Sequence, residues 1–381
     1  MRGHPRVHSP SPPAREGSGM SIRDLGLRVA ATARPGATLR ARLAFAGIPL
    51  AALALVVIVV LASTQGAAAI PPWTATLMLL DRLPLVSIDT GASEAWQRIL
   101  FEIRLPRVFA AALVGAALAT SGSAYQGVFR NPLADPFLLG VASGAALGAA
   151  IAIMSPLPID SWGFGWVPAF AFVGATVAVA SVYLVARTGA SVDDRSLILA
   201  GIALSAMFGG VTSFLLLTGG QRAQPIFEFI FGGFNTSSWE RIAFALPYLA
   251  VGAVVIALHA RALNVMQLDE EQASHLGVDV ARTKVIVLVA ASLMAATAVA
   301  VAGTIGFVGL VVPHAIRIMF GMDYRRTLLA SALVGASFMI VVDLFSRIVI
   351  APQEVPVGIV TSMLGGPFFL YLMRRRRAVG L

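Results

Sequence analysis

Long apolar runs, separated by short polar breaks, fill the chain from residue 43 onward. The runs are continuous rather than alternating, which favours membrane-spanning helices over the strands of a barrel. A helical crossing needs about 20 apolar residues, and ten runs approach that length. They are 43–63, 106–126, 137–154, 167–186, 195–217, 241–259, 283–302, 305–320, 328–349 and 357–373. The pattern predicts an all-α polytopic membrane protein with about ten transmembrane helices.

The polar segments divide the chain into a membrane domain and two tails. Residues 1–42 are rich in Pro and Arg, which predicts a disordered tail. A single transmembrane domain covers 43–375, and a basic tail covers 374–381. The run 43–63 is too long for a signal-peptide core, so we interpret it as an uncleaved anchor, although Ala67-Ala68-Ala69 resembles a cleavage site. The run 305–320 is short and contains Pro313, so its bounds are the least well defined.

Composition agrees with a membrane protein. Of the 381 residues, 57% are hydrophobic and 12% are charged, whereas a soluble domain has about 45–50% and about 25%. Ten crossings with a cytoplasmic N-terminus place 21 basic residues inside and seven outside. Without the tail the division is still 13 to seven. This positive-inside bias predicts that both termini are cytoplasmic.

Several kinds of chemistry are missing from the sequence. The only lysine, Lys284, stands between Thr283 and Val285, so the chain has no Gly-Lys-Ser/Thr phosphate-binding loop. If ATP drives this protein, another subunit must bind it. Cysteine is absent, and no ligand set predicts a metal site. No recognition motif indicates nucleic-acid binding.

Acidic residues avoid the middle of every predicted span, and Asp343 comes closest, beside Arg347. Ion-coupled carriers usually place carboxylates near the midplane. The pattern therefore argues against an ion-coupled secondary transporter, which remains the alternative class. A purely structural membrane scaffold is a third possibility.

The segment at about 264–282 is too polar to cross a membrane and predicts a short cytoplasmic helix. Asp269 is expected to cap its N-terminus, with Gln272 in the reciprocal capping position. Gly277 is expected to end it in the left-handed conformation.

Two features of this helix bear on its role. Glu270 and Glu271 occupy the first turn, where the helix dipole favours negative charge. Ala273 and Leu276 are expected to share one face. Composition alone is compatible with a surface linker and with a docking element for a cytoplasmic partner.

Five segments resemble one family in the right order. They are RLPRVFAAALVGAALATSGSAYQGVFRNPLADPFLLGVASGAALGA (104–148), LDEEQASHLGVDV (268–280), GTIGFVGLVVPHAIR (303–317), DLFSRI (343–348) and EVPVGIVTSMLGGPFF (354–369). Together they are similar to the permease subunits of iron-siderophore, haem and cobalamin (FecCD-like) ABC importers. The likeness covers about residues 95–375, and the tail of 1–40 departs from it.

The resemblance implies a type II ABC importer permease fold in the bacterial inner membrane. It implies a homodimer, two cytoplasmic ATPase subunits that bind ATP and Mg, and a periplasmic substrate-binding protein. The chain itself would be a transport subunit with no cofactor of its own and no enzymatic activity. Haem, ferric siderophore and cobalamin are all carried by such importers, and we favour haem.

The resemblance also implies roles for particular residues. Those expected to dock the binding protein are Arg104, Arg107 and Arg347. Those expected to form the ATPase coupling helix are Glu270, Glu271, Ala273, Leu276 and Gly277. Those resembling cytoplasmic gate elements are Asn131, Pro132, Leu133 and Ser191. Those expected to line the translocation path are Gly201, Ser205, Gly209 and Thr212.

Simpler interpretations stay open for two of these sets. Arg347 could pair with Asp343 or Glu354 within the chain rather than dock a partner. The small residues of the span 195–217 could serve close helix packing rather than a path, because small side chains let helices approach.

Overall fold

The computed structural model describes residues 35–66, 70–82, 88–157, 164–188 and 191–379. It divides into two compact units, 1–43 and 44–381. The described part of the first unit is the start of helix α2, which runs from Pro35 to Thr64. Residues 35–42, predicted to belong to the polar tail, are therefore helical, and the rest of that tail lies outside the described residues.

In the second unit, α5 (Leu105–Val128) forms the centre and most of its residues are buried. It packs against α13 (Val280–Ala302), α14 (Val308–Phe320) and α15 (Tyr324–Ile348). A buried Tyr125 hydroxyl lies 2.6 Å from the Ser292 hydroxyl, and Ser121 donates to the Ala291 carbonyl at 2.9 Å. These polar contacts join α5 to α13.

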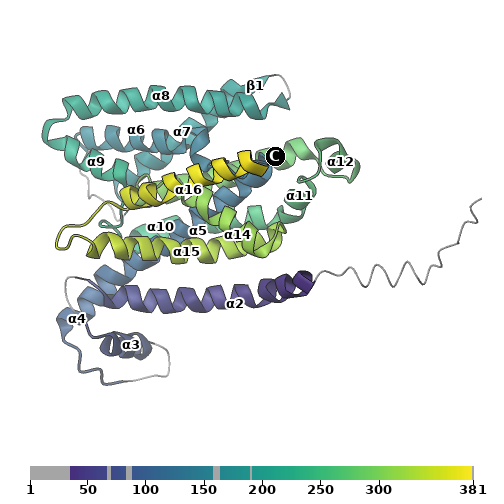
Figure 1. The fold of residues 1–381 in the computed structure, drawn as a ribbon. Helices are drawn as coiled ribbons and strands as arrows, with labels where there is room; N and C mark the ends of the chain where they lie inside the picture. The colour runs from purple at the N-terminus through teal and green to yellow at the C-terminus, as the bar shows by residue number, and fades with distance from the viewer. Residues whose placement is uncertain (1–34, 67–69, 83–87, 158–163, 189–190, 380–381) are drawn as a thin grey trace, which may run out of the picture. The chain divides into compact units, whose positions relative to one another are not determined.

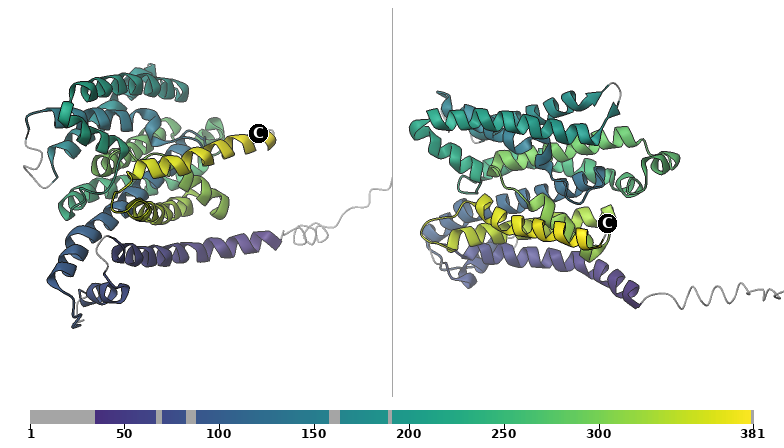
Figure 2. Two further views of the ribbon diagram at one scale, coloured as in Figure 1. Left: turned by 60° about the vertical axis from the view of Figure 1, so that its left-hand side comes forward. Right: turned by 45° about the horizontal axis from the view of Figure 1, so that its top comes forward.

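A second group of helices lies beside this centre (Figures 1 and 2). It consists of α6 (Val141–Met154), α7 (Trp166–Ala186) and α8 (Asp194–Thr218). The hairpin that joins α7 to α8 pairs β1 (Arg187–Thr188) with β2 (Ser191–Val192) antiparallel, with Arg187 opposite Val192.

The remaining elements complete the described chain. They are α3 (Pro72–Asp81), α4 (Glu94–Arg98), the π-helix Ile99–Arg104, the 3₁₀ turns Pro136–Leu139 and Gly220–Arg222, α9 (Ala223–Phe231), α10 (Trp239–Leu258), α11 (Ala260–Val265), α12 (Glu270–His275) and α16 (Val357–Val379). The basic tail predicted for 374–381 is thus largely a continuation of α16.

Seven of the described helices are long and apolar enough to cross a membrane. Two further predicted spans are the shorter apolar helices α6 and α14, and the remaining one is α5. The run predicted at 137–154 loses its first turn because Pro136–Leu139 forms a 3₁₀ turn that ends at Gly140, where φ is +78°. Only 14 residues of α-helix are left there.

Glycines allow α5 to approach its neighbours closely. A Cβ added at Gly122 would collide with the carbonyl oxygen of Gly309, and one at Gly115 with that of Gly335. Small residues at such contacts are what let membrane helices pack by van der Waals contact. The central position of α5 therefore depends on these backbone-to-backbone approaches.

We expect Gly122→Ala to destabilise the protein by about 1–3 kcal/mol, because the added methyl group meets backbone that cannot rotate away. Thermal unfolding in detergent measures the effect. Gly210→Ala on α8 is the matched control, since a Cβ there meets nothing within 4 Å. Equal stability of the two variants would contradict this packing.

Candidate functional site

Helix α5 connects two clusters of charged side chains. Arg107 lies in its first turn, and Arg130 follows two residues after its last residue, Val128. The 24 residues of α5 span about 36 Å at 1.5 Å per residue, slightly more than the roughly 30 Å hydrocarbon core of a bilayer. The two clusters are therefore placed to face opposite surfaces of a membrane. Figure 1 shows the corresponding ends of the bundle at α4 and α12.

The cluster at the α4 end is centred on Arg107. Its Nη2 lies 2.8 Å from Asp343 Oδ1 and 2.9 Å from Glu354 Oε2, and its Nε donates to Asp343 Oδ1 at 2.9 Å. Asp343 is fully buried and also pairs with Arg347, whose Nε lies 3.2 Å from Asp343 Oδ2. One buried carboxylate thus holds two arginines from different helices.

The other two arginines of this cluster reach the C-terminal end of α2. Arg104 Nη1 donates to the Thr64 carbonyl at 2.8 Å and to the Ser63 carbonyl at 3.2 Å. Arg347 Nη1 donates to the Gln65 carbonyl at 3.4 Å. The last carbonyls of a helix have no partner within the helix and attract positive charge. The two guanidinium groups supply that partner.

The structure therefore groups the three arginines that were expected to dock a binding protein. All three also make contacts within the chain, and for Arg347 one of these is the pairing with Asp343 that the sequence left open. Arg104 is only 5% exposed. Burial lowers the pKa of Arg104 from its usual high value, and the nearby Arg347 charge lowers it further. Docking by these residues stays a prediction.

At the other end, α12 forms as a closed helical turn. Gly277 adopts φ +83°, its N–H donates to the Ser274 carbonyl, and the Val278 N–H donates to the Ala273 carbonyl. This is the Schellman pattern of a helix stop, so the predicted role of Gly277 is confirmed. Asp269 is the N-cap residue, as predicted, but its side chain makes no cap hydrogen bond.

The faces of α12 also differ from the prediction. Ala273 is fully buried against its own chain, whereas Leu276 is 63% exposed. Ala273 and Leu276 therefore do not form one docking face. The reason is that a six-residue helix is closed early by Gly277, which leaves Leu276 at its end rather than over the preceding turn.

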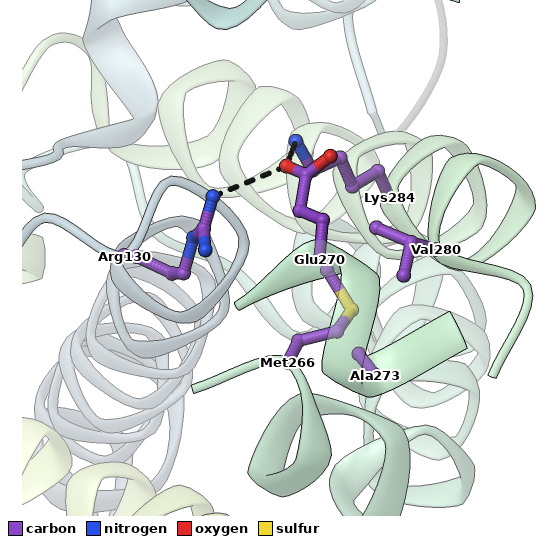
Figure 3. A pocket seen from close by; sticks show the side chains of 6 residues that line it. All are labelled: Arg130, Met266, Glu270, Ala273, Val280 and Lys284. Carbon is purple, nitrogen blue, oxygen red and sulfur yellow. Dashed lines mark hydrogen bonds and ion pairs between the residues drawn. The ribbon is translucent and has the colours of Figure 1, made fainter. Parts of the chain in front are cut away.

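Glu270 is held by two cations from other elements (Figure 3). Its Oε1 lies 2.8 Å from Lys284 Nζ and 3.2 Å from Arg130 Nη2. Lys284 also lies 3.1 Å from Asp194 Oδ1. The hydrogen bond from Lys284 lowers the pKa of Glu270 below its usual value, so the carboxylate stays charged at neutral pH. Sequence reasoning missed this arrangement, although the unique lysine of the chain was a signal for it.

Amide side chains fix the segment that precedes α12. Asn264 Nδ2 donates to Asp323 at 2.8 Å, and Asn264 Oδ1 accepts from the Tyr324 N–H at 2.8 Å. Gln267 Nε2 donates to the Gly127 carbonyl at 3.3 Å. The Asn264 hydrogen bond lowers the pKa of Asp323, which caps α15. The coupling segment is therefore joined to α5 and α15 as well as to α13.

The predicted gate residues lie at the same end of the bundle as α12. Asn131 is exposed, and its Oδ1 accepts from the Leu133 N–H at 3.0 Å, which forms a tight turn around Pro132. Ser191 lies in β2, but its side chain is outside the described residues. A gating role for these residues stays a prediction.

The predicted path residues fall into two groups. Gly201 is buried, and a Cβ there would collide with the Leu138 carbonyl, while Ser205 lies 3.1 Å from the Ser143 hydroxyl. Thr212 is buried and donates to the Phe208 carbonyl of its own helix at 2.8 Å. These three have contacts within the chain, whereas a Cβ at Gly209 would meet open space. A path-lining role for the four residues stays a prediction.

Within the described residues, no group of three His, Asp or Glu side chains could hold a metal ion. The charged clusters at the two ends are ion-pair networks that join helices. Together with a bundle of membrane-length helices, they define a polytopic membrane protein whose polar contact surfaces lie at its two ends.

Comparison with known proteins gives the family of this membrane protein. The chain belongs to the FecCD transport family, which matches residues 52–375. It is 44% identical over 310 residues to the cobalamin import system permease protein BtuC of Halobacterium salinarum, covering 81% of each chain. It is 40% identical over 296 residues to the hemin transport system permease protein HmuU of Yersinia pestis, covering 76% of this chain and 87% of that one.

A solved structure gives the same result. The fold matches an inward-facing conformation of a metal-chelate type ABC transporter with a TM-score of 0.74 and 30% identity. The match covers 86% of this chain and 98% of the other. The resemblance inferred from the sequence motifs is therefore confirmed, and the relatives are transport components rather than enzymes.

We expect Asp343→Asn to cost about 3–5 kcal/mol of stability, because it leaves two arginine charges without their buried partner. Glu354→Gln should cost about 0–1 kcal/mol, since the Glu354 side chain is 35% exposed and its pairing is screened by water. Thermal unfolding of the purified variants measures both. A larger loss for Glu354→Gln would contradict the central role of Asp343.

Proposed function

We propose that this chain is the transmembrane permease subunit of an ATP-driven importer that moves a bulky metal chelate by alternating access. Two copies would form the membrane unit, each with ten crossings and both termini in the cytoplasm. Two ATPase subunits would bind below, and a periplasmic binding protein would dock above, at the bacterial inner membrane. Family membership, the relatives and the metal-chelate transporter structure support this assembly.

The exposed Leu276 on α12 is the main observation in favour of a partner protein that drives transport. A 63% exposed leucine lies at the C-terminal end of a short helix whose own residues are polar apart from the buried Ala273. Glu270 contacts α13, and Asn264 joins the segment before the helix to α15. An exposed apolar side chain at the end of a short helix suits insertion into a cleft of another protein. The chain has no nucleotide-binding loop of its own, so that protein would be the ATPase.

At the opposite end, we assign the docking of the binding protein to Arg107 and Glu354. The Arg107 side chain is 11% exposed, and its Glu354 partner is 35% exposed. An incoming carboxylate on the binding protein could replace Glu354 on this guanidinium group, which can bind two oxygens at once. Arg104 and Arg347 would then act indirectly, by holding α2 beside this surface.

For the cargo we propose haem first and cobalamin as the second candidate. The hemin permease at 40% identity supports haem, and the cobalamin permease at 44% identity supports cobalamin. A ferric siderophore is the third candidate of the same class. Competitive uptake of haem, cobalamin and a ferric siderophore by the reconstituted importer tests the choice, and saturable uptake of haem alone is the expected result.

An ion-coupled secondary transporter is the alternative class. Such carriers use a membrane-embedded carboxylate that can release its ion. The buried Asp343 is instead paired with Arg107 and Arg347 near the end of α15. Uptake by the purified chain with an ion gradient and no ATPase would favour this alternative.

We expect Leu276→Asp to abolish assembly with the ATPase, because it places a charge in the apolar contact. Leu276→Met is the matched control and should assemble normally, since it keeps an apolar side chain of similar volume. Co-purification of the permease with its ATPase from membranes measures assembly. Unchanged assembly and uptake for Leu276→Asp would contradict the assignment of α12 as the coupling helix.

A further inference from the structure

Four side chains of alternating charge form a continuous chain of contacts at the α12 end of the bundle. Arg130 contacts Glu270, Glu270 contacts Lys284, and Lys284 contacts Asp194. They come from four different elements, namely the segment after α5, α12, the start of α13 and the start of α8. We name this set the charge relay. Figure 3 shows Glu270 between Arg130 and Lys284.

The two ends of the charge relay adjoin the two predicted gate segments. Arg130 directly precedes Asn131, and Asp194 lies two residues after β2, which contains Ser191. We propose that the charge relay transmits movement of α12 to both gate segments, with Glu270 and Lys284 as positioning residues. This inference rests on the proposed function, because it assumes that the ATPase moves α12.

The backbone around Arg130 supports such transmission. Arg130 has φ +48°, which L-residues rarely adopt, and its N–H donates to the Gly127 carbonyl. Its Nη1 also donates to the Leu268 carbonyl, one residue before Asp269. Arg130 therefore contacts the coupling segment through both backbone and side-chain atoms of that segment. A displacement of α12 acts on the turn at Asn131 through two contacts.

Lys284 makes the corresponding connection to α8. Its side chain is 14% exposed, and together with Met266, Ala273 and Val280 it lines a small pocket. The Nζ atom reaches Glu270 at 2.8 Å and Asp194 at 3.1 Å. Asp194 lies in the first turn of α8. A shift of Glu270 would therefore displace the start of α8 through Lys284.

The exposure of these groups argues against a mainly stabilising role. Glu270 is 51% exposed and Arg130 is 35% exposed, and ion pairs so close to water contribute little to folding. Pairs of this kind can break and form again during a transport cycle. Variants of the charge relay should therefore fold and assemble, so that coupling can be measured separately.

The test uses the complete importer in proteoliposomes, with ATP hydrolysis and chelate uptake measured on the same preparation. We expect Lys284→Met to keep ATPase assembly and to hydrolyse ATP within about twofold of the parent. Uptake per ATP should fall about tenfold, within the 5–150-fold range of typical coupling between sites. Lys284→Arg should keep most of the uptake, because guanidinium can contact both carboxylates.

Two further variants test whether the loss of uptake comes from the broken contact between Lys284 and Asp194 or only from the change at Lys284. Asp194→Asn breaks the contact at the α8 end and should lower uptake per ATP in the same way. Combining Lys284→Met with Asp194→Asn should cost no more than Lys284→Met alone, since that change already removes the contact with Asp194. Arg282→Gln is the matched control, because it removes an exposed positive charge two residues from Lys284 and should leave uptake per ATP unchanged.

The outcomes distinguish this inference from the proposed function. If the parent importer shows no ATP-dependent uptake, the proposed function fails. If the parent transports and Lys284→Met transports with the same uptake per ATP, the charge relay has no coupling role. Parallel loss of ATP hydrolysis and uptake in every variant would also overturn the inference, because it indicates a purely structural role.

Discussion

Ionised groups are costly inside a hydrocarbon layer, and this constraint organises the structure. The ion pairs of the described residues lie in two clusters, at the two ends of the bundle. Between them α5 is mostly buried and carries no charged side chain from Val108 to Val128. A rigid apolar helix of membrane length thus separates two polar contact surfaces.

The two clusters use charge differently. At the α4 end, the fully buried Asp343 holds Arg107 and Arg347, so this network is tight and stabilising. At the α12 end, Glu270 is half exposed and its pairs are screened by water. The first arrangement suits a fixed platform, and the second suits contacts that rearrange. This difference suits an importer in which the α4 end receives a binding protein and an ATPase moves the α12 end.

The helical membrane class and the family could be predicted from the sequence, because apolar runs and long motifs are local properties. The sequence also predicted the helix stop at Gly277, since only a residue that tolerates positive φ fits there. The faces of side chains were harder to predict. Whether Ala273 points inward, or whether Gly201 packs on Leu138, depends on neighbours that are distant in the sequence. The partners of Glu270 come from residues 130 and 284 for the same reason.

The proposed function requires the Arg107–Glu354 surface and the α12 surface to lie on opposite sides of the membrane. The chain has no cysteine, so single cysteines can be placed at Glu354 and at Leu276 without further changes. We predict that a membrane-impermeant maleimide labels the Glu354→Cys variant in intact spheroplasts and labels Leu276→Cys only after the membrane is permeabilised. Labelling of both cysteines from the same side would show that the two surfaces face the same compartment, and the proposed function would fail.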